Sequence, residues 1–351
     1  MGYLKNLKLI LLVALLPLGF LSCTSLSSIS IDVMRPAEYS VPPDLLSAVV
    51  LDFSYPHSGD SVHKLIINGV TTPIDTVRID DFGLRVANSM ALELDNRMFF
   101  DSVYLHPVSL NKPPAGRPGI QLSREQIADI IDEYNAHLVI AVEDVSYNTE
   151  VKVIDLGGYY YSTLDAFGEV LWRIYDRYGD VLDEYLQNDS IYWDNRDTQY
   201  SSNLSAMPSL RNSVESLADF MGRYYPDRIS PFWEKQRRYY YSSGHHLFSR
   251  ANDLIKAHNW ESAARVWYYV FEEGNKKQKA ISAFNIALSY EIRGDFAEAA
   301  AWADKSRALF QDLGSFSASS LDVERANRYY NELNERIKEA EKLQEQVGLG
   351  L

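Results

Sequence analysis

The chain has 351 residues, of which 46% are hydrophobic and 23% charged, and its formal net charge is -14. This length and composition are typical of one or two globular domains with buried cores, and they exclude an intrinsically disordered protein. The negative charge disfavours nucleic acid and anionic lipid headgroups as partners, because both repel a chain of this sign. Aromatic residues make up 13% of the chain, with 24 Tyr among them, and such rings fill a core or line a binding surface.

The amino-terminal segment has the pattern of a secretion signal. Two lysines, Lys5 and Lys8, precede an apolar run from Leu9 to Leu21. The run contains Pro17 and is shorter than the ~20 apolar residues that a membrane-spanning helix needs. Residues 1–22 are therefore predicted to form a signal peptide that is removed from the mature protein.

Cys23 is the only cysteine of the chain and directly follows this segment. The text "FLSC", Phe20 to Cys23, resembles a bacterial lipobox, in which the cysteine is acylated and becomes the first residue of a lipoprotein. An ordinary secretory signal that ends near a cysteine is the alternative. A lone cysteine has no disulfide partner within the chain, which favours lipidation.

The lipoprotein resemblance also implies a location. Several acyl chains on Cys23, palmitate among them, would hold the protein in a bilayer without help from electrostatics. Thr24 follows Cys23 and no acid appears before Asp32, which is similar to the pattern of lipoproteins sorted to the outer membrane. We therefore expect a cell-envelope protein that is lipid-anchored in the outer membrane and faces the periplasm. Residues 23–44 are expected to act as a lipidated tether with one short strand, Ile29–Val33.

Residues 45–240 show alternating strand and helix signals. Their order is strand, helix, strand, helix, strand, hairpin, helix and last strand, predicted over 47–55, 80–100, 102–105, 122–136, 137–147, 170–193, 209–225 and 229–243. Ser123 and Gln126 have the spacing of a capping box, and Asn68-Gly69 indicates a hairpin turn. This order predicts a mixed sheet with helices packed on it, and so an α+β fold whose first part is a mixed-sheet α/β domain.

The order of elements from Ser47 to Ser230 resembles the nucleotide-free α/β domain of several envelope proteins. These are the lipoprotein activator of penicillin-binding proteins, the curli secretion-channel lipoprotein and the N-terminal domain of the Tol translocation protein. The closest text is "VANSMALELDNRMFFDSVYL" followed by "YNAHLVIAVEDV". The chain also resembles uncharacterised bacterial envelope lipoproteins that pair such a domain with tetratricopeptide repeats. The resemblance assigns no catalytic residue.

Residues 241–348 are predicted to form an all-α domain of tetratricopeptide-like repeats with a C-terminal capping helix. "HNWESAARVW" (258–267) aligns with "GDFAEAAAWA" (294–303) at an offset of 36 residues, close to the ~34-residue period of that family. The second copy departs from the pattern at Ala303. The residues expected to pack where paired helices cross are Ala251, Trp260, Ala263 and Trp267 in the first repeat and Ala287, Tyr290, Gly294, Phe296 and Ala299 in the second.

The tripeptide Arg293-Gly294-Asp295 is often interpreted as a cell-adhesion signal, and the repeat offers another interpretation. Gly294 supplies the left-handed conformation that ends a helix, and Asp295 is suited to begin the next one. We therefore predict a turn between two helices. Farther on, an apolar stripe from Ala326 to Val347 on a long charged helix is expected to pack on the second repeat.

No residue pattern predicts an enzyme, a cofactor or a metal. Asp52 and Glu143-Asp144 follow predicted buried strands, where open α/β sheets gather their ligands. Neither a phosphate-binding glycine loop nor a nucleophile accompanies them, so surface carboxylates that end buried strands are the preferred interpretation. The candidate metal-binding histidines lack the cysteines and the motif spacing of a metal site; they are His245, His246 and His258.

Two tyrosine clusters, Gly157–Ser162 and Arg237–Ser243, are expected to lie in a core or on a face where sugars or peptides stack.

The anchor, the repeats and the lack of a nucleophile favour a non-enzymatic scaffold whose partners are the membrane and an envelope protein. Nucleic acid and metal are not expected as partners. Glycan binding beside an outer-membrane importer is the alternative. A hydrolase that uses Asp52 and Glu143, and a pore former with long strands between Tyr147 and Trp193, are further hypotheses.

Overall fold

The computed structural model describes residues 25–55, 63–74, 78–111, 116–117, 119–314 and 318–347, so the predicted signal peptide and Cys23 lie outside the described residues. The chain divides into two compact units. The helical unit comprises the residues up to Arg35 together with Trp233–Glu345, and the sheet unit comprises Pro36–Phe232 and Gln346–Gly348. In the described part of the chain, no helix combines the length and the apolar character needed to span a bilayer.

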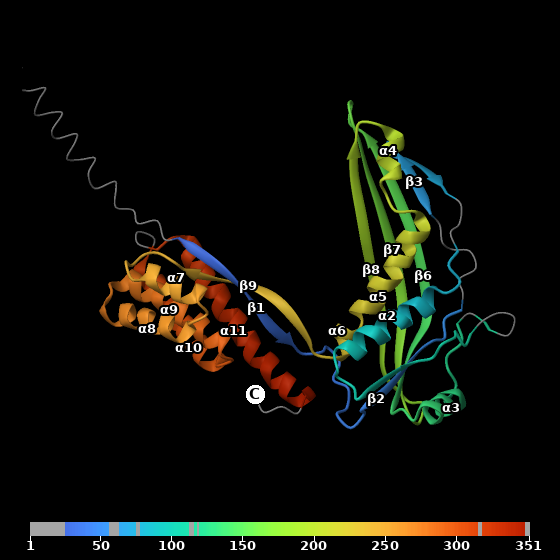
Figure 1. The fold of residues 1–351 in the computed structure, drawn as a ribbon, viewed down its shortest axis with the longest axis horizontal. Helices are drawn as coiled ribbons and strands as arrows, with labels where there is room; N and C mark the ends of the chain where they lie inside the picture. The colour runs from blue at the N-terminus through green and yellow to red at the C-terminus, as the bar shows by residue number, and fades with distance from the viewer. Residues whose placement is uncertain are drawn as a thin grey trace, which may run out of the picture. The chain divides into compact units, whose positions relative to one another are not determined.

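The sheet unit is built on a seven-stranded mixed sheet in the order β4-β3-β6-β2-β5, with β7 paired to β6 and β8 paired to β7. β2 runs parallel to β5 and to the first part of β6, and β3 runs parallel to the last part of β6. The other pairs are antiparallel. β6, β7 and β8 are much longer than the rest (Figure 1). The strands are β2 (Ser47–Asp52), β3 (Lys64–Ile67), β4 (Val70–Pro73), β5 (Ser102–Leu105), β6 (Leu138–Asp155), β7 (Tyr160–Asp176) and β8 (Val181–Asp197).

Helices cover the two faces of this sheet unequally. Val50 packs under α2 and α5, whereas the preceding residue, Val49, packs under α3 on the opposite face. This follows from the pleat, because successive residues of a strand point to opposite faces. α3 packs on β2, on the first part of β6 and on Tyr175 near the end of β7. The helices are α2 (Phe82–Asn96), α3 (Arg124–Tyr134), α4 (Tyr200–Ser205), α5 (Leu210–Tyr224) and α6 (Pro226–Ile229).

Close packing of α5 on α2 depends on one glycine. A Cβ atom on Gly222 would lie 2.2 Å from the carbonyl oxygen of Val86 in α2. Two ion-paired hydrogen bonds of 2.9 Å from Arg85 to Asp219 join the same helices beside this crossing. The pair of helices is thereby fixed over the sheet core.

A β-bulge in the long strand β6 changes which of its residues face the core under α2 and α5. The pairing of β6 with β7 shifts between Val142 and Asp144, so Glu143 is the extra residue. Val145 consequently lies in the same core as Val142. Ser146 and every second residue after it face the other side of the sheet.

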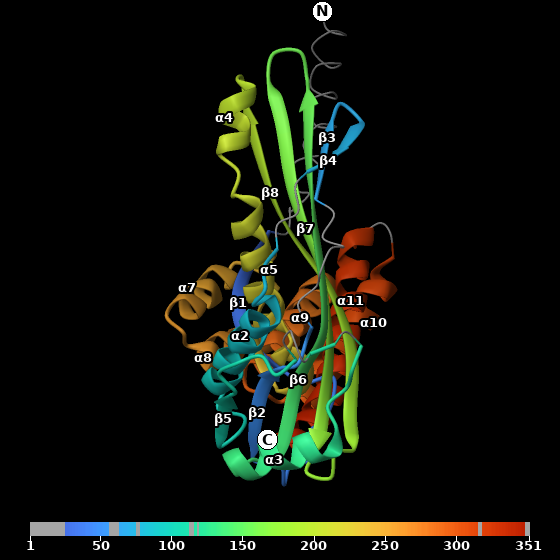
Figure 2. The same cartoon turned by 90° about the vertical axis from the view of Figure 1, so that its right-hand side faces the viewer.

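The far ends of the long strands have a small core of their own. β3 and β4 form a hairpin with Asn68-Gly69 at its turn, and both residues have positive φ angles, 47° and 85°. A two-residue turn of this kind requires such angles. Val153 and Leu164 pack there against residues of β3 and α4, and Figure 2 shows the β6–β7 turn, the β3–β4 hairpin and α4 gathered at this end.

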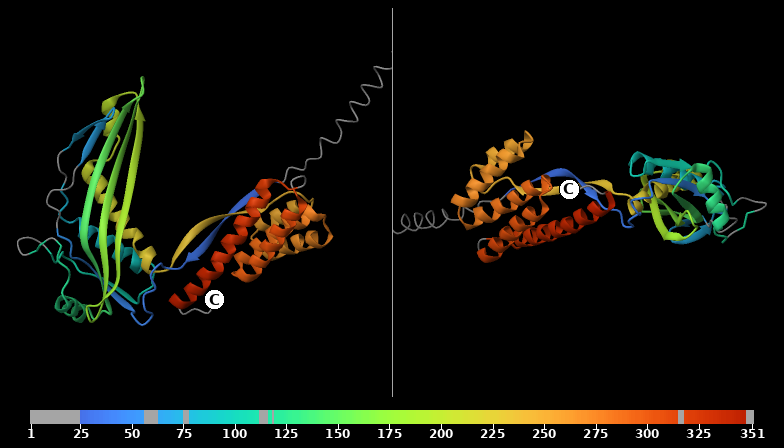
Figure 3. Two further views of the ribbon diagram at one scale, coloured as in Figure 1. Left: turned by 180° about the vertical axis from the view of Figure 1, so that it is seen from behind. Right: turned by 90° about the horizontal axis from the view of Figure 1, so that it is seen from below.

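The helical unit combines five described helices with a two-stranded ribbon of β1 and β9 (Figure 3). Ser242 donates its backbone N–H to the carbonyl oxygen of Ser25, while Arg35 lies beside Glu234, so the ribbon is antiparallel. α8 packs on α7, α9 packs on α8, and α10 packs on α9. The elements are β1 (Leu26–Arg35), β9 (Phe232–Tyr241), α7 (Phe248–Lys256), α8 (Trp260–Glu273), α9 (Lys276–Ile292), α10 (Phe296–Leu313) and α11 (Ser320–Val347).

Two segments are arranged differently from the expectation. The sequence predicts that residues 229–243 close the main sheet, but β9 pairs with β1 in the separate ribbon. In the segment predicted as a tether, 23–44, the expected short strand Ile29–Val33 is part of a longer strand, β1, which begins at Leu26 and pairs with β9. Period-two alternation identifies a strand without identifying its partner, and the ion-paired ends of these two strands are 199 residues apart in the sequence. The sheet unit is therefore an insertion between the two strands of the ribbon.

Candidate functional site

Asp52, a candidate acid at the end of β2, is held by hydrogen bonds to a residue in the loop that follows the strand. Its side chain is buried, and its Oδ1 accepts hydrogen bonds from the backbone N–H and the hydroxyl of Ser54 at 2.9 and 2.6 Å. A Cβ atom on Gly83, in the first turn of α2, would lie 2.4 Å from the same oxygen. The carboxylate thus lies at the N-terminus of α2, where the helix dipole stabilises a negative charge.

Glu143, the second candidate acid, is the buried bulge residue of β6. Its carboxylate pairs with the guanidinium of Arg173 and accepts a hydrogen bond from the hydroxyl of Tyr175. Burial, together with the hydrogen bond to Glu143, raises the pKa of the Tyr175 hydroxyl, which therefore stays protonated as a donor. Asp144 is exposed and its Oδ1 accepts from the N–H of Val145. The preferred interpretation as surface carboxylates therefore fits Asp144 alone.

The three candidate metal-binding histidines, His245, His246 and His258, do not come together around one point. The rings of His245 and His246 lie 4.2 Å apart, and burial followed by the charge of His246 lowers the pKa of His245. His258 is exposed in the turn before α8 with a φ of 56°. Among the residues that the structure describes, no group of three or more His, Cys, Asp or Glu side chains is placed to hold a metal ion.

The repeat residues occupy equivalent places in two successive helix pairs. Trp260 is the first residue of α8, and Phe296 is the first residue of α10. Trp260 packs half-buried against the core, and the guanidinium of Arg336 lies over the Phe296 ring at 4.8 Å. Tyr290 is also half-buried, and its hydroxyl accepts a hydrogen bond from Tyr268 at 2.7 Å. The fully buried members of the set are Ala251, Ala263, Trp267, Ala287 and Ala299.

Arg293-Gly294-Asp295 forms the turn between α9 and α10. Gly294 has a φ of 82°, and its N–H donates to the carbonyl oxygen of Glu291. Asp295 is the N-cap of α10, and the guanidinium of Arg293 lies over the ring of Tyr290 at 4.2 Å. The predicted helix turn is therefore confirmed.

Part of the repeat surface is covered by the chain itself. The buried amide of Asn285 in α9 accepts from the N–H of Tyr241 and donates to its carbonyl oxygen, both at 2.8 Å. The hydroxyl of Tyr241 donates to Asp322 of α11 at 2.7 Å. β9 therefore contacts α9 and α11 as an extended ligand would, and its last residues are not accessible to a partner.

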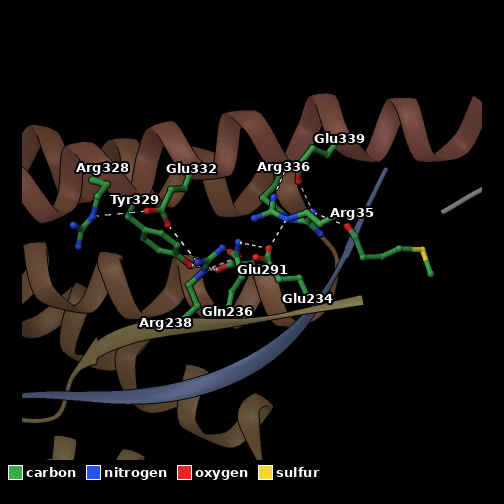
Figure 4. Close-up of polar contacts among 11 residues, drawn as sticks. Arg35, Glu234, Gln236, Arg238, Glu291, Arg328, Tyr329, Glu332, Arg336 and Glu339 are labelled. Carbon is green, nitrogen blue, oxygen red and sulfur yellow. Dashed lines mark hydrogen bonds and ion pairs between the residues drawn. The ribbon is translucent and has the colours of Figure 1, made fainter. Parts of the chain in front are cut away.

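An ionic cluster, shown in Figure 4, fastens the ribbon to the helices. Arg238 of β9 donates through Nε to both carboxylate oxygens of Glu291, at 2.9 and 3.0 Å, and the two side chains are 8% and 1% exposed. Arg35 of β1 bonds to Glu234 and to Glu339 of α11. Burial opposes the charge of Arg238, but Glu291 outweighs it and raises the pKa of the guanidinium.

Among the described residues, no helix packs on the face of β6, β7 and β8 beyond α3, and we call it the open face. Three rows of residues cross it on paired strands, and a hollow is centred on the first two rows. Phe167 is 37% exposed in the second row and Tyr192 is 70% exposed in the third. The rows are Ser146–Glu169–Asn188, Asn148–Phe167–Ser190 and Glu150–Asp165–Tyr192.

The charge of the open face is negative around the hollow. Among the described residues, the carboxylate of Glu169 lines it and no lysine, arginine or histidine does. Asp189 borders the hollow through its backbone, because its side chain points to the α5 side and accepts a hydrogen bond from Gln187. Ser146 donates to Glu169 at 3.3 Å. At the third row, a hydrogen bond from Lys152 lowers the pKa of Glu150. The open face therefore offers amide and hydroxyl groups, carboxylates and an exposed ring to a neutral or cationic ligand.

The family described as "Domain of unknown function (DUF8603)" matches residues 45–241, more than half of the chain. The chain belongs to this family. A second family, described as "Domain of unknown function (DUF6340)", matches residues 249–335, from α7 into α11. The DUF8603 region thus runs from the start of the mixed sheet to the end of β9.

Comparisons with curated proteins and solved structures add little to the DUF8603 assignment. No curated protein matches the sequence. Among solved structures, a Helicobacter pylori homologue of neuraminyllactose-binding hemagglutinin matches 54% of this chain and 87% of its own, with 10% identity and a TM-score of 0.24. At this level, the likeness gives no information about ligands of the DUF8603 region.

Most tyrosines of the two predicted clusters already pack against other residues of the chain. Tyr240 and Tyr241 are buried in the helical core. In the DUF8603 region, the guanidinium of Arg196 lies 3.6 Å from the ring of Tyr159, and Tyr160 packs edge-on against Tyr200. Sequence reasoning missed the open face, because its polar residues alternate with core residues and are individually ordinary.

Proposed function

We propose that this protein is a non-enzymatic binding protein of the cell envelope, anchored by a lipid on Cys23 in the outer membrane and facing the periplasm. The lipobox-like text before Cys23 supports the anchor. The equivalent places of Trp260 and Phe296 in two helix pairs support tetratricopeptide-like repeats, with α11 as the cap. A binding role, and not catalysis, is supported by the way Asp52 and Glu143 are held by their neighbours.

One observation favours the open face as the partner-binding surface. The sheet carries helices along one side, whereas the other side beyond α3 is exposed and hollowed. By contrast, β9 already covers the repeat surface near Asn285. The open face holds an exposed phenylalanine at its centre with polar side chains around it, an arrangement similar to the apolar centre and polar rim of protein interfaces. We infer that an envelope protein binds there.

Changing Cys23 to serine is expected to move the protein from the membrane fraction to the soluble periplasmic fraction. The change removes the thiol that would carry the acyl chains, and the described residues contain no helix that spans a bilayer. Cell fractionation followed by immunoblotting measures the distribution, and Ser25→Ala serves as a matched control that stays membrane-bound. Membrane retention of the Cys23→Ser protein would exclude the proposed anchor.

A photo-crosslinking residue at Ser190 on the open face is expected to give a discrete protein adduct in intact cells. The same residue at Leu92, which is 59% exposed on α2, is expected to give none, because α2 lies on the covered side of the sheet. Adducts are detected as shifted bands and identified by mass spectrometry. Equal adduct patterns at both positions, or none at either, would contradict a partner on the open face.

Glycan binding is the second candidate, and the open face favours it over the tyrosine clusters. Phe167 and Tyr192 are exposed in adjacent rows, and Asn148, Asn188 and Glu169 surround them with planar hydrogen-bonding groups. Sugar rings stack on aromatic faces and exchange hydrogen bonds with such groups. Binding on a glycan array that is lost in Phe167→Ala and kept in Tyr239→Ala would support this candidate, and an array without signal would exclude it.

A further inference from the structure

The chain enters the folded helical unit almost directly after Cys23. The N–H of Ser25 donates to the hydroxyl of Ser243 at 2.6 Å, and the N–H of Ser242 donates to the carbonyl oxygen of Ser25 at 3.0 Å. Ser25 is thus fixed at one end of the ribbon. Cys23 precedes it by two residues, which span at most ~7 Å when fully extended.

This short reach limits where a bilayer can lie. An acyl chain on Cys23 inserts into the hydrocarbon, so the cysteine itself lies at the headgroup level. The residues around Ser25 then lie at the membrane surface. Residues 23–44, predicted as a tether with one short strand, do not hold the helical unit away from the membrane, because β1 begins at Leu26.

Cationic residues occur in the first turns of the two helices that follow or contact this loop, α7 and α9. Gln278, in the first turn of α9, donates to the carbonyl oxygen of Gly244 at 3.2 Å, which places this turn beside the Ser242–Gly244 loop. Arg250 is exposed and Lys277 is half-buried. Lys276 pairs with Asp312.

We propose that this end of the helical unit, formed by the Ser242–Gly244 loop and the first turns of α7 and α9, is a docking surface for phospholipid headgroups. The inference rests on the proposed lipid anchor. Lys277 and Arg250 donate to headgroup phosphates, which fit ammonium and guanidinium groups. The chain as a whole is anionic, so these two cations also orient the protein by keeping its acidic surfaces away from the bilayer.

The opposite end of the ribbon then points away from the membrane. β1 has ten residues and is roughly 33 Å long at about 3.3 Å per residue. At its far end, Arg336 of α11 donates to the carbonyl oxygen of Met34 at 2.9 Å. Lys338, in the same turn of α11, has a side chain that is 69% exposed, so it reports on that end.

The lone cysteine of the chain makes this orientation measurable. Acylation consumes the thiol of Cys23, so a cysteine introduced elsewhere can be labelled alone in the full-length lipidated protein. Ser249→Cys, in the first turn of α7, reports on the proposed docking surface, and Lys338→Cys reports on the far end. Each protein is labelled with a fluorophore and reconstituted into vesicles that carry a quencher on the lipid headgroup.

We expect strong quenching of the label at position 249 and loss of quenching at position 338. Adding Lys277→Glu and Arg250→Glu to the Ser249→Cys protein is expected to reduce its quenching, whereas Glu261→Lys, on an exposed pair elsewhere, is not. Equal quenching at 249 and 338, or stronger quenching at 338, overturns the docking surface. Mass spectrometry of the Cys23 peptide is measured in parallel: without acylation both the anchor and this inference fail, and with acylation only the inference is at stake.

Discussion

Replacing Arg238 with alanine is expected to lower the free energy of unfolding of the helical unit by about 3–5 kcal/mol, the usual effect of removing one partner from a buried ion pair. The guanidinium is 8% exposed and makes two hydrogen bonds to Glu291, whose own side chain is 1% exposed. Without it, the buried carboxylate keeps the hydrogen bond from the hydroxyl of Tyr329 at 2.7 Å but loses its buried cationic partner. Urea denaturation followed by circular dichroism measures the change.

A second substitution separates the lost ion pair from lost packing. Arg238→Met combined with Glu291→Gln is expected to be more stable than Arg238→Met alone, because the glutamine is neutral and still accepts from Tyr329. Arg265→Ala is the matched control, since Arg265 pairs with Glu261 on the surface at 65% and 77% exposure, and its loss is expected to cost less than about 1 kcal/mol. A double variant as unstable as the single one would show that the charge pair is not the cause.

The sequence predicts those parts of the fold that depend on neighbours in the chain. Ser123 and Gln126 form the capping box that their spacing indicates. Asn68-Gly69 forms the hairpin turn, and Gly294 ends α9 in the left-handed conformation. Each of these is a local arrangement in which residue type and spacing fix the backbone. A mixed sheet followed by helices is confirmed for the same reason, since alternation and helical periodicity are local signals.

The ribbon, the ionic cluster and the open face depend on contacts between residues that are far apart in the sequence. β9 has the alternation of a sheet strand, but nothing in residues 229–243 indicates that its partner is β1. Arg238 meets Glu291 across 53 residues, and only the fold reveals that Glu291 is buried. The open face likewise arises from the register that places Asn148, Phe167 and Ser190 side by side on three strands. Single polar residues on alternate positions of a strand do not predict such a row.

A fragment of residues 241–347, the described part of the predicted repeat domain 241–348, is expected to lack a cooperative thermal transition. It loses Arg238 and Tyr240, so Glu291 has no guanidinium partner and part of the helical core is exposed. Leaving Glu291 buried without its guanidinium partner costs about 3–5 kcal/mol, a large share of the 5–15 kcal/mol that typically separates folded from unfolded domains. Differential scanning calorimetry and amide hydrogen exchange test this expectation, and a cooperative transition at the temperature seen for the helical unit of the full chain would contradict it.

Restoring the ribbon is expected to restore folding without the sheet unit. Arg35 and Glu234 are neighbours across the ribbon, so residues 25–35 can be joined to residues 233–347 by a short turn such as Asn-Gly, which suits two antiparallel strands. This protein contains both strands, the ionic cluster and all five helices, and should unfold in a single transition. The same fusion with Arg238→Ala is expected to melt at a lower temperature. If the fusion folds and the 241–347 fragment does not, the helical unit owes its stability to two strands that the inserted sheet unit separates in the sequence. The strand that follows the proposed anchor then belongs to the folded body, as the membrane-facing orientation requires.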